Sequence, residues 1–398
     1  MTEALHVPVA VIGGGPAGVS AALALARHGM GVLVLEKGDG RGTAIGESLA
    51  PSANPLLHRL GLYDALLASD PLPCYGNRSA WGGDGALADR DSLREPFGHG
   101  WHLDRAAFNA SLLTAAADGG ALVWRGARVV SLEQDQRTWR LQVAAGSSMR
   151  LVTSDYLIDA SGRAGIVARH QGVRRRVIDS LVAAVAFLES GASASCDATT
   201  LVEAVAAGWW YTALLPSGRA TVAWFTDPDL LARTGAWRPA AWWRLLAETV
   251  ATRERAAAHG PAPPVSIRVM PAGSGLLTRL AGEGWLAVGD AAASFDPLSS
   301  HGIGSALVGG HQAARAAASW LAGDETAHAA YTDHVVGAFA HYLWLRHAYY
   351  ADEQRWPEAP FWRRRHVSGR QPMSRYEHLA HRDGRGGGVR VSAAISRH

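Results

Sequence analysis

Lysine is almost missing from this sequence, so nearly all of its basic side chains are arginines. Of the 38 basic residues in 398, only Lys37 is a lysine. They oppose 35 acidic residues, which leaves a net charge of +3, and no arginine-rich helix or arm stands out. A small, scattered surplus of this kind does not predict nucleic-acid binding. A base-composition bias of the genome explains the preference for arginine.

The sequence has only two cysteines, and it shows no pattern typical of a signal peptide. Cys74 and Cys196 lie far apart without a CxxC pair, and at most one disulfide favours a reduced, cytoplasmic protein. No basic stretch precedes the first apolar segment, and glycines at 13–15 interrupt it, so neither a signal peptide nor a membrane span is expected. The 17 histidines show no metal-ligand spacing, so no metal is expected.

The overall composition is that of a folded globular chain. The sequence is 48% hydrophobic and 18% charged, which excludes a disordered chain and a coiled coil. At about 150 residues per domain, the length predicts two or three packed units.

A glycine-rich turn follows the first predicted strand, which is centred on residues 7–12. In the pattern Gly13-x-Gly15-x-x-Gly18, the first glycine permits the tight turn and the second lets a pyrophosphate approach the backbone. Gly18 allows the following helix to pack closely on the strand. That helix is predicted from Pro16 to about residue 28, and its N-terminus favours an anion. The context predicts a dinucleotide site, with Ala17 among its contacts.

The next predicted strand, at residues 32–35, ends at Glu36. Its carboxylate is 23 positions beyond Gly13, at the spacing expected for binding a ribose 2′-hydroxyl. The same negative charge would repel a 2′-phosphate, so NADP is disfavoured. These residues alone do not separate FAD from NAD.

Two motifs in the second half select flavin. The segment Asp159-Ala-Ser161-Gly-Arg163 follows a predicted strand, and the segment from Trp285 through Asp290 to Gly302 leads into a predicted helix. With these motifs the chain resembles the FAD-dependent monooxygenase superfamily that includes p-hydroxybenzoate hydroxylase, geranylgeranyl reductase and the flavin-dependent halogenases.

The resemblance implies specific contacts with FAD. Asp290 would bind the ribityl chain, and the helix beginning at Gly302 and Ile303 would direct its N–H groups at the flavin edge that becomes anionic on reduction. The Asp104-Arg105-x-x-Phe108 segment resembles a family motif whose arginine reaches the cofactor. The expected FAD contacts are Gly13, Gly15, Pro16, Ala17, Gly18, Glu36, Lys37, Glu47, Ser48, Arg105, Val129, Ser161, Asp290, Pro297, Gly302 and Ile303.

The resemblance also implies an α/β fold in which a Rossmann-like FAD-binding domain carries an inserted antiparallel-sheet substrate domain. We expect the FAD-binding domain at residues 1–70, 100–170 and 271–330, and the substrate domain at 71–99 and 171–270. A C-terminal helical segment is expected at 331–366, followed by a mobile tail at 367–398.

Within the superfamily the chain resembles the halogenase-like branch. The Ile45-Gly46-Glu47-Ser48 segment is similar to the GES strap of that branch, and Asp296-Pro297-Leu298-Ser299-Ser300 to its DPxxS segment. Halogenases depend on a lysine a few dozen residues beyond the strap, however, and this sequence has no lysine after Lys37. Tryptophan halogenases carry a glutamate where Ser299 lies, and the WxWxIP motif is absent. Halogenation is therefore disfavoured.

The segments 208–219 and 349–364 resemble flavoproteins that mature tryptophan-derived quinone cofactors, and related biosynthetic monooxygenases. This resemblance implies hydroxylation of an aromatic, indole- or tryptophan-like substrate, free or borne by a peptide or protein, through a flavin C4a-hydroperoxide. Electrons would come from NAD(P)H directly or through a separate flavin reductase. The alternatives are an FAD-dependent dehydrogenase or saturase without oxygen insertion, and a non-enzymatic maturation partner.

Aromatic residues are the candidates for the substrate pocket. Because side chains alternate along a strand, Trp209 and Tyr211 should share one face, and Trp81 is a further candidate. Ordinary sheet core explains these rings equally well. His301, just before the expected flavin-facing helix, is the candidate acid–base residue, against a simple capping role.

Overall fold

The computed structural model describes residues 4–38, 45–91, 95–189, 197–300 and 302–368. Cys196, His301 and nearly all of the expected C-terminal tail lie outside the described residues. No helix in the described ranges is long and apolar enough to cross a membrane.

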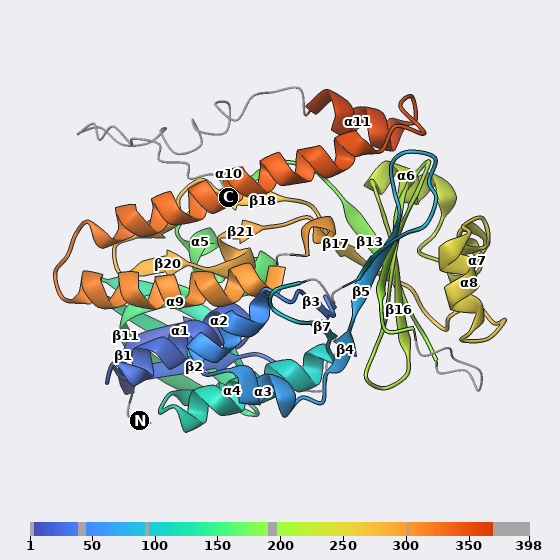
Figure 1. Cartoon of the computed structure of the whole chain (residues 1–398). Helices are drawn as coiled ribbons and strands as arrows, with labels where there is room; N and C mark the ends of the chain where they lie inside the picture. The colour runs from blue at the N-terminus through green and yellow to red at the C-terminus, as the bar shows by residue number, and fades with distance from the viewer. Residues whose placement is uncertain (1–3, 39–44, 92–94, 190–196, 301, 369–398) are drawn as a thin grey trace.

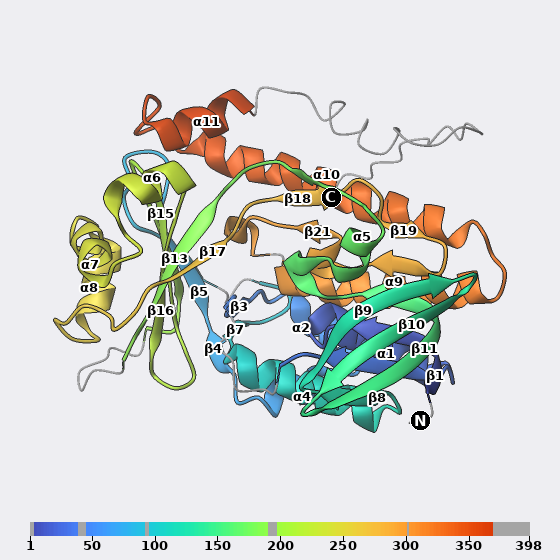
Figure 2. The same ribbon diagram turned by 180° about the vertical axis from the view of Figure 1, so that it is seen from behind.

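The larger sheet has eight strands and a parallel centre (Figure 1). Its core is β1, β2 and β11, which are hydrogen-bonded in parallel register; most of β1 and β2 and the carboxyl half of β11 are buried. The strand order is β19 (Ala281–Gly282), β20 (Trp285–Ala287), β11 (Ser148–Asp159), β1 (Leu5–Ile12), β2 (Val32–Glu36) and β8 (Leu122–Arg125). Strands β10 (Thr138–Ala145) and β9 (Ala127–Asp135) form an antiparallel ribbon that pairs with β11 through β10, as Figure 2 shows.

The first strand–helix–strand unit agrees with the sequence prediction. Helix α1 (Pro16–Arg27) begins with a proline in its first turn, where the missing N–H costs nothing, and Gly29 follows the last turn at a φ of +74°. Helix α4 (Arg105–Asp118) begins after Asp104, which caps it by accepting hydrogen bonds from the backbone N–H groups of Ala106 and Ala107.

The smaller domain is a seven-stranded sheet that stands at one end of the molecule (Figure 1). Most neighbours are antiparallel, as predicted, and one face packs toward the large sheet while the other is covered by helices. Its order is β17 (Arg268–Pro271), β13 (Val182–Leu188), β16 (Ala220–Thr226), β15 (Gly208–Leu214), β14 (Thr200–Val205), β5 (Gly76–Ala80), β6 (Ala88–Asp91), and the helices beside it are α6 (Pro228–Thr234), α7 (Pro239–Ala247) and α8 (Ala251–Ala257).

Two three-stranded sheets and two long helices join these layers. The long helices α9 (Gly302–Leu321) and α10 (Ala327–Asp352) lie side by side, and α10 reaches from the large sheet to α11 (Pro360–Ser368) above the smaller one (Figure 1). The remaining elements are β12 (Arg175–Val177), β18 (Gly275–Leu277), β21 (Ala293–Ser294), β3 (Ser48–Leu49), β4 (Leu72–Cys74), β7 (Gly100–His102), α2 (Ala53–Leu60), α3 (Tyr63–Leu67) and α5 (Ile166–His170).

Two strands pair in ways that join the layers. Strand β11 pairs with β10 over residues 148–154 and with β1 over residues 152–159, so one strand connects the antiparallel ribbon to the parallel centre. Strand β12 falls within the expected substrate segment but pairs with β18, outside the seven-stranded sheet.

Candidate functional site

A cavity of about 410 Å³ lies between the two domains, at the carboxyl end of the parallel strands. The large sheet contributes the glycine turn and the turn after β20, and the smaller sheet contributes one face of its central strands. Among its lining residues are Gly15, Pro16, Ala17, Glu47, Ser48, Arg105, Tyr211, Thr221, Phe225, Met270, Asp290, Asp296, Pro297, Gly302 and Ile303. The sequence predictions for ten cofactor residues and for Tyr211 therefore converge on this cavity.

The glycine turn leaves room for a ligand at one position only. A Cβ at Gly13 would clash with the backbone of Ala160, and one at Gly18 with the carbonyl of Gly13. A Cβ at Gly15 would meet nothing within 4 Å, because this residue faces open space at the N-terminus of α1. The first N–H groups of a helix lack partners within the helix, so an anion can bind there.

Glu36 closes this turn from the end of β2. Its carboxylate accepts hydrogen bonds from the backbone N–H groups of Gly14 and Gly38, each at 2.6 Å. A carboxylate has about four acceptor positions, so capacity for a ribose hydroxyl remains. Lys37, next in sequence, is exposed.

The close packing of α1 on α9 brings two helix N-termini to the same cavity. A Cβ at Gly310 would clash with the carbonyl of Ala17 and lie 2.8 Å from the Cβ of Ser20, so only a glycine permits this approach. The Ser20 hydroxyl donates to the Leu307 carbonyl at 2.7 Å and ties the helices together. A neighbouring cavity of about 360 Å³ borders the other side of Gly302, so the first turn of α9 is flanked by open space.

Asp290 lies on the turn after β20, which two arginines hold in place. Arg175 donates to the carbonyls of Asp290 and Ala291 at 2.9 and 2.7 Å. The Arg163 Nε lies 3.4 Å from the Asp290 carboxylate, whose side chain is still 43% exposed toward the cavity. A carboxylate presented in this way can bind hydroxyl groups of a ligand.

Arg105, on α4, holds in place the strap of residues 45–48 that carries Glu47. This buried guanidinium donates to the carbonyls of Ile45 and Gly46 at 3.2 and 2.8 Å. The next residue, Ser48, is hydrogen-bonded to the Tyr211 hydroxyl at 2.8 Å and so joins the strap to the smaller sheet. These hydrogen bonds hold the strap in place between α4 and the smaller sheet.

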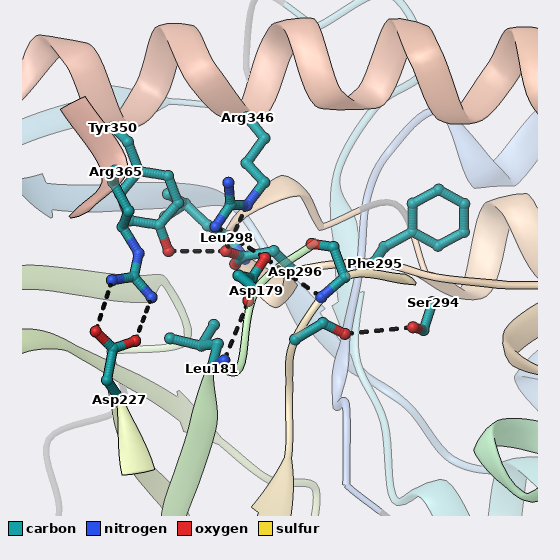
Figure 3. A network of polar contacts seen from close by, with 12 residues as sticks. Asp179, Leu181, Asp227, Ser294, Phe295, Asp296, Leu298, Arg346, Tyr350 and Arg365 are labelled. Carbon is teal, nitrogen blue, oxygen red and sulfur yellow. Dashed lines mark hydrogen bonds and ion pairs between the residues drawn. The ribbon is translucent and has the colours of Figure 1, made fainter. Parts of the chain in front are cut away.

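A buried ionic network supports the opposite edge of the cavity (Figure 3). The Asp296 side chain, 0% exposed, caps the backbone N–H of Leu298 at 3.0 Å and accepts from Arg346 at 3.1 Å. Arg346, on α10, also lies 3.0 Å from Asp179. Burial raises the pKa of Asp296. Burial alone would lower the pKa of Arg346, but the two neighbouring carboxylates raise it, so the guanidinium stays charged.

Tyr350 connects this network with the aromatic candidates. Its hydroxyl donates to Asp296 at 2.8 Å and accepts from the Trp209 indole N–H at 3.0 Å. Trp209 is 1% exposed and stacks on Phe225 at 3.9 Å between ring centroids, so it lies behind the cavity wall. Trp81 packs against Trp209 and Tyr350 and does not line the cavity either.

Comparison with known proteins identifies the group to which this architecture belongs. Residues 6–336 match a family described as the FAD binding domain. The chain belongs to this family. It is 34% identical over 360 residues to a Marinomonas mediterranea protein assigned by name as an FAD-dependent oxidoreductase, LodB, covering 90% of this chain and 96% of that protein.

Solved structures confirm the resemblance to the monooxygenase superfamily and its halogenase-like branch. The flavin-dependent halogenase CmlS has a TM-score of 0.78 with 26% identity, covering 92% of this chain and 68% of its own. The peptidyl tryptophan dihydroxylase QhpG has a TM-score of 0.76 with 23% identity, covering 90% of this chain and 78% of its own, which shows a shared fold. The expected fold class and an FAD-dependent oxidoreductase are thus confirmed.

The residues of the cavity fit the FAD that this family binds. The open side of Gly15 suits a pyrophosphate, Asp290 the ribityl hydroxyls, and the N-terminus of α9 an electron-rich ring edge. When bound, FAD supplies two-electron redox chemistry and, once reduced, reactivity toward O2.

A few predicted residues are not brought to the cavity. The Ser161 hydroxyl donates to Asp159 and accepts from the Ile166 N–H at 2.9 Å, so it ties the end of β11 to the start of α5. Val129 lies within the antiparallel ribbon, opposite Val143. The candidate acid–base residue His301 lies outside the described residues, so its role stays a prediction.

Sequence reasoning missed the polar residues that come from the smaller domain and from α10. Thr221 and Arg346 carry no motif, and only their place in the fold brings them to the cavity or to its supporting network. Asp296 was visible as part of the DPxxS segment, but its buried ionic partners were not.

Proposed function

We propose that the protein is an FAD-dependent monooxygenase that hydroxylates an electron-rich aromatic ring, with tryptophan, free or within a peptide, as the leading candidate. Support comes from the tryptophan-dihydroxylase activity named for QhpG, together with the cavity itself. Reduced flavin would take its electrons from NAD(P)H or from a separate flavin reductase.

The observation that carries this proposal is the wall of the cavity that the smaller sheet provides. It is formed by Ala183, Ala223, Phe225 and Met270, with Tyr211 and Thr221 as its polar members. Apolar side chains exclude water, which protects reactive oxygen species from wasteful breakdown. A flat aromatic ring would bury its faces against such a wall.

The lining of the cavity also opposes halogenation, because no lysine belongs to it, although a halogenase is among the structural neighbours. Halogenases, as a group that this chain resembles, depend on a lysine amine near the substrate. The single lysine of this sequence, Lys37, is exposed at the end of β2 and does not line the cavity. The two arginines that do, Arg105 and Arg163, have guanidinium groups that stay protonated and are poor nucleophiles.

Turnover with a tryptophan-containing peptide tests the proposal. The FAD-loaded protein, reduced chemically, would receive O2 with and without bromide, and an anaerobic sample would receive an artificial electron acceptor. We expect a product heavier by oxygen in both aerobic samples. A brominated product would establish halogenation, and anaerobic turnover without added oxygen would establish a dehydrogenase.

A further inference from the structure

Glu47 is a buried carboxylate without a hydrogen-bond partner. Its side chain is 2% exposed and lines the cavity, and neither carboxylate oxygen accepts a hydrogen bond from any residue in the described ranges. Buried carboxylates in folded proteins are normally paired, because the cost of removing the charge from water is otherwise uncompensated. The structure therefore leaves this group ready for a partner that enters the cavity.

The groups around Glu47 do not satisfy it. Arg105, from α4, donates to strap carbonyls and makes no hydrogen bond to the carboxylate. Tyr211, from β15, is hydrogen-bonded to Ser48. The Thr221 hydroxyl, from β16, and the backbone N–H groups of Gly46 and Glu47 are close enough to favour the ionised form of Glu47, but none of them reaches its carboxylate with hydrogen-bond geometry. The Thr221 oxygen is itself buried with no hydrogen-bond partner in the described ranges.

Three oxygens without a hydrogen-bond partner in the described ranges, two from Glu47 and one from Thr221, thus belong to residues that line the cavity. These two residues share the lining of the cavity with Ala223, Phe225 and Met270, the apolar residues of the wall that the smaller sheet provides. A ligand complementary to this surface has a flat apolar body and one hydrogen-bond donor on its edge. An indole ring, with a single N–H, has that chemistry.

We propose that Glu47 is the catalytic base of this cavity and accepts a hydrogen bond from the ring N–H of an indole-type substrate, with the Thr221 oxygen as a second acceptor. This inference rests on the proposed function and names its substrate class. It also assigns Glu47 to the substrate, whereas the sequence motif suggested a cofactor contact.

The proton balance of this role is closed. As a ring carbon gives its electron pair to an oxygen atom that comes from O2, the N–H proton moves to Glu47. The C–H proton then passes to the second oxygen atom of O2, which leaves as water, the nitrogen regains its proton from Glu47, and the aromatic ring is restored. The two electrons that reduce the second oxygen atom to water come from reduced flavin. Burial raises the pKa of Glu47, which makes it a stronger base than an exposed carboxylate.

Binding to the oxidised, FAD-loaded protein tests the donor contact without turnover. The probes are indole and 1-methylindole, and N-acetyltryptophan amide with its 1-methyl analogue. We expect the wild type to bind the N–H form of at least one pair about tenfold more tightly or better, as for hydrogen bonds to charged groups. In Glu47→Leu the preference should disappear, while Glu283→Gln on the exposed surface should keep it. A wild type without this preference, or a Glu47→Leu variant that keeps it, would overturn the proposal.

Two further readouts separate the alternatives. Glu47→Gln keeps an acceptor but cannot take the proton, so it should retain part of the binding preference and lose about 100-fold or more in turnover. Both variants should keep bound FAD, measured by flavin absorbance. Loss of FAD with unchanged probe preference would make Glu47 a cofactor ligand and refute the proposal. A wild type that prefers the N–H probes but inserts no oxygen would instead refute the proposed monooxygenase function.

Discussion

Glu47 and Asp296 are both buried carboxylates on the same cavity, yet the protein treats them in opposite ways. Asp296 is held by Arg346, Tyr350 and the Leu298 N–H, whereas Glu47 has no hydrogen-bond partner in the described part of the chain. A fully paired carboxylate supports the fold, and an unpaired one costs stability. The contrast indicates that Asp296 has a structural role in forming the cavity, whereas Glu47 has a role in binding or catalysis.

Removal of Arg346 should break the Asp296 side of this comparison most severely. Arg346→Met would leave Asp179 and Asp296 as uncompensated buried charges, and the loss should be about 3–5 kcal/mol in the free energy of unfolding. Urea unfolding measures it. Adding Asp296→Asn to this variant should recover part of the loss. A single-variant loss below about 1 kcal/mol would show that the network is not structural.

Tyr350→Phe should have the next largest effect. It removes the hydroxyl that donates to Asp296 and leaves the Trp209 indole N–H buried without an acceptor. The expected loss is about 1–3 kcal/mol in the free energy of unfolding. The neighbouring Tyr349, 44% exposed, provides the control, because Tyr349→Phe should change stability little. Equal effects in the two variants would argue against the hydrogen-bond chain.

Glu47→Gln should raise the free energy of unfolding at neutral pH by up to about 1 kcal/mol, because no hydrogen bond is lost and a neutral amide replaces an unpaired buried carboxylate. The informative readout is the pH dependence of unfolding. Because burial raises the folded pKa of Glu47, the folded state binds the proton more tightly than the unfolded chain does, and stability falls as pH rises through the folded pKa. This part of the decline should be missing in Glu47→Gln. Parallel pH profiles for variant and wild type would contradict the assignment.

Asp229, a surface carboxylate, completes the series. Arg364 binds it at 2.7 and 2.9 Å and lowers its pKa to about 2. Its contribution is therefore present at neutral pH and lost as pH falls through about 2. Because the pair is exposed to water, Asp229→Asn should cost only about 0.5 kcal/mol, and added salt should reduce the difference. A loss as large as that of Tyr350→Phe would be inconsistent with a screened surface pair.

The sequence predicted what depends on local chain geometry. Gly13, Gly15 and Gly18 lie within one strand–turn–helix unit, and Asp290 and Gly302 lie in a second short motif, so their spacing alone reveals the site. The shared face of Trp209 and Tyr211 also follows from strand alternation, and the structure confirms that both side chains belong to the same cluster.

How deeply a side chain is buried, and which residues from distant segments contact it, could not be predicted in the same way. Alternation does not tell that Tyr211 reaches the cavity while Trp209 lies behind Phe225, because this depends on how the two domains pack. Arg346 and Asp179 meet Asp296 only through tertiary structure. Thr221 belongs to no sequence motif, and only the fold brings it close to Glu47.

Isotope labelling of the product tests the central claim most directly. The reduced, FAD-loaded protein would be given a tryptophan-containing peptide under ¹⁸O2 in ordinary water, and the peptide would then be analysed by mass spectrometry. The account predicts that the aromatic ring gains oxygen carrying the ¹⁸O label. Unlabelled oxygen from water, or a peptide oxidised without gaining oxygen, would contradict it.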